Sequence, residues 1–271
     1  SSVLYGNNSS AGSVNIITNQ SIKDKEEINT KFSLGSFGKF ESYVSGTKVF
    51  KNFSIKGSQN QIFSDGYRRN NEYSQTNGGL ELASKFNQYS YYVNLQSYNN
   101  RLDLPGDVGV NTGNYSSSNG FHTDPRSTDT PQDFSQKNGL KIFYGLTYEI
   151  SHSDKVIVDG AFDYVKNEGI FLSSDTNTDA KISNYLLSPR FLTNRNILGF
   201  ESDVILGMDA NYTYYYQDKM RIGETYYRKY KAQDKSLALY FNNNLFVSPE
   251  DKISIGARIQ ANWIRIGDQI N

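Results

Sequence analysis

The chain has 271 residues, of which 28 are basic and 28 are acidic, so its formal net charge is zero. This balance offers no basic face for a nucleic-acid partner, and the absence of cysteine excludes disulfides, thiolate metal sites and a cysteine nucleophile. Hydrophobic residues make up 37% and aromatic residues 14%, which argues against a conventional soluble core. No run of about 18 apolar residues predicts a membrane helix.

The chain opens with a strand-like unit, and residues 1–20 read SSVLYGNNSSAGSVNIITNQ. A short apolar run at 3–5 precedes a turn of Gly, Asn and Ser at 6–12, residue types that favour turns. The largely β-branched stretch at 14–18 then favours a second strand. By itself this pattern predicts a hairpin with a long turn and specifies no function.

The same residues resemble the last segment of the plug domain in TonB-dependent outer-membrane receptors. In that family a pattern close to S-x-L-Y-G-x-x-A-x-G-G-x-I-N-I-I-T leads into the first strand of a barrel with about 22 strands. Ser13 departs from the pattern, which usually has a second Gly there, and the position of Ala11 differs. The resemblance implies that residues 1–20 end a plug, inside the barrel or at its periplasmic mouth, and that 21–27 form a linker. The matching residues are Ser2, Leu4, Tyr5, Gly6, Gly12, Asn15, Ile16, Ile17 and Thr18.

A period of two dominates the rest of the chain. At 140–150 every even position is apolar or Tyr, and at 253–263 every odd position is apolar. Alternation this long predicts strands, longer than the usual length of about 5–6 residues and close to the about 9–11 of a tilted membrane strand. We therefore expect the apolar sets to face lipid. The residues expected to face a polar lumen include Lys141, Glu149, Arg258 and Gln260.

About eleven segments of this kind predict an all-β protein, a transmembrane antiparallel β-barrel with about half of the family's strands. Pro189 falls in the eighth segment and cannot donate to a ladder, so we expect an edge or a bulge there. Residues 28–271 then form a partial barrel, and the chain is expected to be a piece of a longer protein. The segments lie near 28–37, 39–50, 53–64, 76–86, 88–100, 138–150, 155–167, 182–193, 200–217, 234–247 and 252–266.

The connections alternate in length, as in outer-membrane barrels with short periplasmic turns and longer extracellular loops. Aromatic residues such as Phe50 and Phe53 flank the short turns, as in an interfacial belt. The pattern predicts a protein of the bacterial outer membrane, in contact with outer-membrane lipid. Short turns are expected at 51–52, 87, 151–154, 193–199 and 248–251, long loops at 65–75, 99–137, 167–181 and 218–233, and a tight tip at 35–38.

No catalytic site is predicted. His122 and His152 lie far apart and match no metalloprotease spacing, and the chain has no G-x-S-x-G motif. His122 and Asp124 alone are too few ligands for a metal site. We expect neither an enzyme nor a resident metal or cofactor, with a barrel-type hydrolase as a minor alternative.

The connection at 99–137 is the best candidate for function, because loops of this length are usually functional or disordered. Its pieces LDLPG and DPR…P.DF resemble those of iron-complex receptors of the ferric citrate and siderophore type. The planar guanidinium groups of Arg101 and Arg126 suit the carboxylates of an anionic ferric chelate. The alternative is that these arginines pair with neighbouring aspartates and order the loop. The other predicted ligand contacts are Arg68, Arg69, Tyr115 and His122.

The resemblance implies active uptake. A ligand such as a ferric chelate binds outside the cell, and the TonB energy-transducing protein acts on the plug through a segment that precedes this sequence. Two alternatives stay open at this point. A passive porin-like channel would have the strands without a plug, and a soluble secreted β-rich adhesin would have the strands without the membrane.

Overall fold

The computed structural model describes residues 25–106, 126, 130–171, 176–197, 199–221, 227–248 and 250–270. All regular structure within these ranges is β-strand. No helix in the described part of the chain has the length and hydropathy of a membrane span. Several predictions fall outside the described residues: the plug segment with Leu4, Tyr5, Gly6, Gly12, Asn15, Ile16 and Ile17, and the loop residues Tyr115 and His122.

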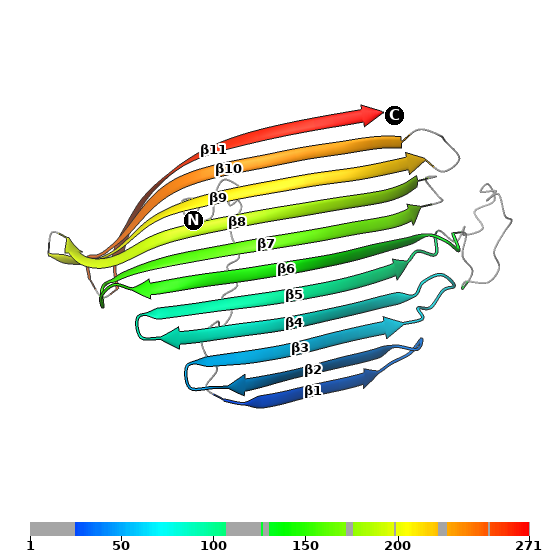
Figure 1. Cartoon of the computed structure of the whole chain (residues 1–271), viewed down its shortest axis with the longest axis horizontal. Helices are drawn as coiled ribbons and strands as arrows, with labels where there is room; N and C mark the ends of the chain where they lie inside the picture. The colour runs from blue at the N-terminus through cyan, green and yellow to red at the C-terminus, as the bar shows by residue number, and fades with distance from the viewer. Residues whose placement is uncertain are drawn as a thin grey trace.

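Eleven strands follow one another in chain order, and each pairs antiparallel with its neighbours in sequence (Figure 1). They form one open sheet, with β1 and β11 at its edges. The predicted all-β fold, the strand number and the partial barrel are therefore confirmed. The strands are β1 (Glu27–Leu34), β2 (Phe40–Val49), β3 (Phe53–Ser64), β4 (Tyr73–Phe86), β5 (Tyr89–Asp103), β6 (Phe134–Glu149), β7 (Asp154–Phe171), β8 (Thr176–Ile197), β9 (Phe200–Arg221), β10 (Tyr227–Phe246) and β11 (Lys252–Ile270).

The sheet has an apolar face and a polar face. Side chains alternate between the faces of a sheet, and directly opposite residues share a face, so a row of cross-strand partners samples one face. A slip of one residue would exchange the two kinds of row. One apolar row consists of Leu80, Leu95, Ile142, Phe162, Tyr185 and Tyr212. The adjacent polar row consists of Gly79, Gln96, Lys141, Asp163, Asn184 and Thr213.

The predicted division of β11 into two faces is confirmed. Ile255 and Ile259 are 64% and 73% exposed on the apolar face. Arg258 points to the other face, where its guanidinium pairs with Asp209 of β9 at 2.7 Å and lies 5.5 Å from the centre of the Tyr240 ring. The period-two pattern therefore gives the correct register for the last strand of the sheet.

The connections lie at two opposite ends of the sheet (Figure 1). At one end, the turn end, are residues 50–52, 87–88, 150–153, 198–199 and 247–251. At the other end, the loop end, are 35–39, 65–72, the described ends of the β5–β6 connection at 104–106 and 130–133, and the strand ends at Phe171, Thr176, Arg221 and Tyr227.

The long loops predicted at 167–181 and 218–233 are wrong. β7 continues to Phe171 and β8 begins at Thr176, while β9 continues to Arg221 and β10 begins at Tyr227. The sequence loses its alternation there because charged residues such as Glu168 and Asp179 enter the face that is apolar elsewhere. Backbone pairing nevertheless continues, as in Glu168↔Asp179. The strands therefore extend past the segments that hydropathy marks.

Aromatic and polar contacts stabilise the turn end. Phe50 and Phe53 stack with ring centres 4.3 Å apart across the β2–β3 turn. The carboxylate of Asp154 accepts hydrogen bonds from the Thr193 hydroxyl at 2.6 Å, from Arg195 at 2.7 Å and from the Ser151 hydroxyl at 3.0 Å. These donors, chiefly Thr193, hold the pKa of the Asp154 carboxyl below its usual value.

Pro189 lies neither at an edge nor at a bulge, contrary to the prediction. It sits in β8, between β7 and β9. Pairing with β9 stops after Leu187 and resumes at Arg190 with the register unchanged. Across this interruption the Ser188 hydroxyl donates to Asp209 Oδ1 at 2.6 Å. The missing N–H of Pro189 therefore interrupts the β8–β9 ladder locally and leaves the register of the two strands unchanged.

Candidate functional site

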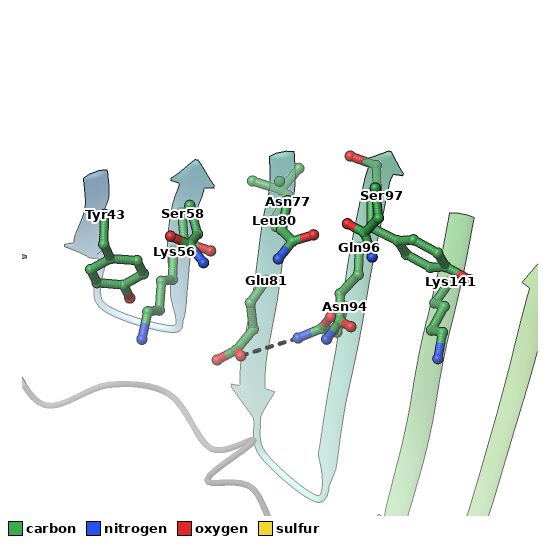
Figure 2. A pocket seen from close by; sticks show the side chains of 15 residues that line it. Tyr43, Lys56, Ser58, Asn77, Leu80, Glu81, Asn94, Gln96, Ser97 and Lys141 are labelled. Atoms are coloured by element: carbon green, nitrogen blue, oxygen red, sulfur yellow. Dashed lines mark hydrogen bonds between the residues drawn. The ribbon is translucent and has the colours of Figure 1, made fainter. Parts of the chain in front are cut away.

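The polar face is hollowed over β2 to β6 (Figure 2). The hollow has a volume of about 430 Å³, and five of its fifteen lining residues carry side-chain amides. Among the described residues, the Oδ1 atoms of Asn60, Asn94 and Asn100 are buried and accept no hydrogen bond. The Nδ2 group of Asn94 donates to Glu81 Oε2 at 3.4 Å, and Lys56 is the cross-strand partner of Glu81. The wall of the hollow is therefore polar and carries a few charged groups, while these three amide oxygens are covered by their neighbours.

Between β6 and β11 the polar face carries ion pairs that join neighbouring or next-neighbouring strands. Each joins a basic side chain to an aspartate on another strand, and the pair between Arg258 and Asp209 is the most buried, with exposures of 11% and 22%. Because the charges are paired, the face has little net field, and an anion can be attracted only locally. The other pairs are Lys141–Asp163 at 3.8 Å and Arg190–Asp159.

Tyrosine rings lie flat against glycines on the polar face. A Cβ added to Gly145 would lie 2.2 Å from the Tyr92 ring, and one added to Gly207 would lie 2.2 Å from the Tyr240 ring. A Cβ at either position would require the ring to shift, so the glycines allow the close approach. The Tyr92 hydroxyl then reaches Asp159 Oδ1 at 3.2 Å.

At the loop end, residues 65–72 contact the β5–β6 connection at 104–133. The Arg126 guanidinium lies 5.6 Å from the centre of the Tyr67 ring, and the Arg126 carbonyl accepts a hydrogen bond from the Arg69 amide at 2.8 Å. Arg68 Nη1 donates to the Gly106 carbonyl at 2.7 Å. Three of the four predicted arginines therefore take part in the contact between the two loops, which we call the loop cluster. Arg68 and Arg126 contribute their guanidinium groups, and Arg69 contributes its backbone amide.

Arg101 lies apart from this cluster. Its register partner is Gln136, in a row on the same side as the apolar face. Its Nε donates to Asp103 Oδ1 at 2.9 Å, and its guanidinium lies 4.5 Å from the centre of the Phe134 ring. This is the pairing with a neighbouring aspartate that the sequence left open as the alternative.

Comparison with known proteins identifies the fold. No family model matches the chain, and no curated protein matches it in sequence. Solved structures do match: the ferric-catecholate import receptor Fiu from Escherichia coli K12 superposes with a TM-score of 0.77 at 12% identity, over 94% of this chain and 43% of that chain. The chain has the barrel fold of TonB-dependent outer-membrane receptors.

Two further receptor barrels support this. The ferric yersiniabactin uptake receptor FyuA from Yersinia pestis gives a TM-score of 0.74 at 12% identity, over 100% of this chain and 47% of that chain. The ferric citrate transporter FecA gives 0.68 at 12% identity, over 88% and 37%. The chain therefore spans less than half the length of these TonB-dependent receptor structures.

Sequence reasoning predicted the polar face, but it did not predict which arginines take part in the contact between the loops, and it missed other residues. It did not anticipate the amide-lined hollow with Lys56 and Glu81, although period two assigns both side chains to one face. It also missed Asn70, whose carboxamide contacts both ends of the 104–133 connection. No pattern in the sequence marks Asn70, because its partners are distant in the chain.

Proposed function

We propose that this chain belongs to a TonB-dependent receptor of the bacterial outer membrane that takes up a metal chelate, a ferric complex of citrate or a siderophore. The match of the eleven-stranded sheet to receptor barrels supports the proposal most directly, with a TM-score of 0.77 to the ferric-catecholate receptor. The polar hollow and the apolar opposite face support it as well, because a lumen and a lipid surface need that division. In this proposal TonB supplies the energy, and outer-membrane lipid surrounds the apolar face.

We further propose that the chelate binds at the loop end. Arg68 and Arg69 of the β3–β4 loop and Arg126 of the β5–β6 connection take part in the contact between the loops there. Tyr115 and His122 belong to the same connection as Arg126. Arg101 is the weaker candidate of the predicted set, because Asp103 already pairs with it on the other side of the sheet. A charge-assisted contact contributes about 1.5–3 kcal/mol, so loss of one should weaken binding roughly ten- to a hundredfold.

The test is uptake of radioactive iron by cells that depend on the receptor. Cells starved of iron are given ferric citrate, a ferric catecholate or a ferric hydroxamate, with and without a protonophore that dissipates the proton-motive force. We expect uptake of one chelate that requires both the gene and the proton-motive force. Uptake that persists with the protonophore would favour a porin-like channel, and recovery of the protein without detergent would favour a secreted adhesin.

The ligand site is tested with Arg126→Ala and Arg101→Ala. We expect Arg126→Ala to raise the dissociation constant roughly tenfold or more and Arg101→Ala to have the smaller effect. If both variants bind as the unmodified receptor does, these arginines order the loops without contacting the chelate. If only Arg101→Ala weakens binding, the ranking of the two residues is wrong.

A further inference from the structure

Asn70 lies at the centre of the contact between the two loops. Its Nδ2 group is within hydrogen-bond distance of three backbone carbonyl oxygens: 2.9 Å from Leu104, 2.5 Å from Thr130 and 3.0 Å from Asp133. A carboxamide nitrogen has two hydrogens, so the three oxygens share them. Leu104 begins the 104–133 connection, and Thr130 and Asp133 lie near its end. One side chain of the β3–β4 loop therefore binds both ends of the next loop.

Other hydrogen bonds join the two ends of the 104–133 connection to each other and to the β3–β4 loop. The Leu104 amide donates to the Asp133 carbonyl at 2.9 Å, and the Thr130 hydroxyl donates to the Leu104 carbonyl at 2.6 Å. Arg68 adds a bond to the Gly106 carbonyl from the same loop as Asn70. Thr130 and Asp133 are 5% and 3% exposed. The bonds to these two residues are thus shielded from water, which makes an unmatched polar group there costly.

The backbone of Asn70 is set for this role. Its φ is 54°, in the left-handed region that asparagine tolerates better than most residues. Glycine also tolerates this conformation, so Asn70→Gly removes the carboxamide while keeping the backbone shape. Aspartate has nearly the same size but no donor when ionised, so Asn70→Asp places a negative charge against three carbonyl oxygens.

We propose that Asn70 is a positioning residue. It fixes the described ends of the connection, at 104–106 and 130–133, to the β3–β4 loop. It thereby sets the position of Arg126 relative to Arg68, two of the arginines proposed to bind the ferric chelate. The inference rests on the proposed function, because it assigns Asn70 a part in chelate capture. It assigns no direct contact between Asn70 and the chelate.

The experiment measures the loop contact and the binding separately. The receptor that contains this chain is purified as the unmodified protein and as the Asn70→Asp and Asn70→Gly variants. Hydrogen exchange follows the Leu104 amide, with the Asp103 amide as an internal control, because Asp103 donates to the Glu72 carbonyl at 2.9 Å and not to Asp133. Association and dissociation rates are measured with ferric citrate and with a ferric catecholate.

A matched control is Asn87→Asp. Asn87 also has a left-handed backbone, with φ of 51°, but it lies in the β4–β5 turn at the turn end. The Asn87→Asp variant makes the same change in charge at a residue with the same backbone conformation, but far from the loop end. The melting midpoint of each variant shows whether the barrel is intact.

We expect Asn70→Asp to speed exchange at Leu104 roughly tenfold or more, to leave Asp103 unchanged, and to slow chelate association roughly tenfold at an unchanged melting midpoint. Asn70→Gly should change the exchange rate and the association rate in the same directions by smaller factors. If Asn70→Asp does not fold, Asn70→Gly serves as the test variant. Faster exchange with unaltered association overturns the positioning role and leaves the proposed function standing. Unaltered exchange overturns the contact itself. If the unmodified receptor binds neither chelate, the positioning role falls with the proposed function, while the exchange data still report on the loops.

Discussion

Replacing Leu146 with arginine tests which face of the sheet meets lipid. Leu146 lies on the apolar face of β6 and is 43% exposed. Its cross-strand partners are Tyr91 of β5 and Val158 of β7. The next residue, Thr147, points to the polar face, so Thr147→Arg introduces the same side chain one position along the strand. The two variants introduce the same charge on opposite faces of the same strand.

The position of Leu146 sets the size of the effect. On β6 the apolar face runs through Ile142, Tyr144, Leu146 and Tyr148, so Leu146 lies well inside the apolar band. An arginine on the lipid side near the bilayer midplane costs about 2–4 kcal/mol. We therefore expect Leu146→Arg to lower the free energy of unfolding by about 2–4 kcal/mol. Thr147→Arg should change it by about 0.5 kcal/mol or less, as at most solvated positions.

The assay is urea unfolding of the receptor in phospholipid vesicles, followed by the shift in gel mobility between the folded and the heat-denatured barrel. The free energies of the two variants are compared with that of the unmodified receptor. Equal losses in both variants would show that β6 has no preferred lipid face. A larger loss for Thr147→Arg than for Leu146→Arg would reverse the assignment of the two faces and refute the reasoning.

Three further predictions concern the polar face and the turn end. Gly145→Val should lower stability by about 1–3 kcal/mol through overpacking against Tyr92, measured by the same urea assay. Arg258→Met should cost about 1–3 kcal/mol by leaving Asp209 without its cation, and its effect should be smaller in an Asp209→Leu background, since the two changes share one interaction. The pKa of Asp154 is lower in the folded state than in the unfolded state. The ionised carboxylate therefore stabilises the fold above about pH 4, and this stabilisation is lost as the pH falls through the folded pKa. Melting midpoints measured against pH should show this loss in the unmodified receptor and not in Asp154→Asn.

The strands and their faces could be predicted from sequence because each depends on a local rule. Side chains alternate in every strand, and a lipid or lumen environment selects opposite residue types for the two sides. Arg258 shows this, because its neighbours in sequence place it on the polar face before any partner is known. The same rule fails beyond Lys166, where Glu168 places a charge on the face that is apolar elsewhere, although pairing continues to Phe171. Hydropathy reports the environment of a strand, whereas backbone hydrogen bonds determine its length.

The loop contact could not be predicted because its partners are far apart in sequence. Asn70 meets Asp133 across 63 residues, and no period or spacing relates the two positions. The arginines show the same limit. Composition and loop length placed Arg101 and Arg126 in one connection, but the strand β5 runs to Asp103. Arg101 therefore belongs to a strand with a fixed face, and Arg126 belongs to the loop cluster. Which arginines converge depends on where the strands end.

Pro189 is an exception to the rule that confines proline to edge strands and bulges. Proline cannot donate to a ladder, so within sheets it is usually confined to edge strands, first residues and bulges. β8 runs from Thr176 to Ile197, and its ladder with β7 is continuous through Pro189. The ladder with β9 holds the same register on both sides of the gap, so the long paired segments fix the strand where the proline donates nothing. The polar face supplies an additional link there through Ser188 and Asp209. The tolerance for proline in a central strand thus depends on the length of pairing around it.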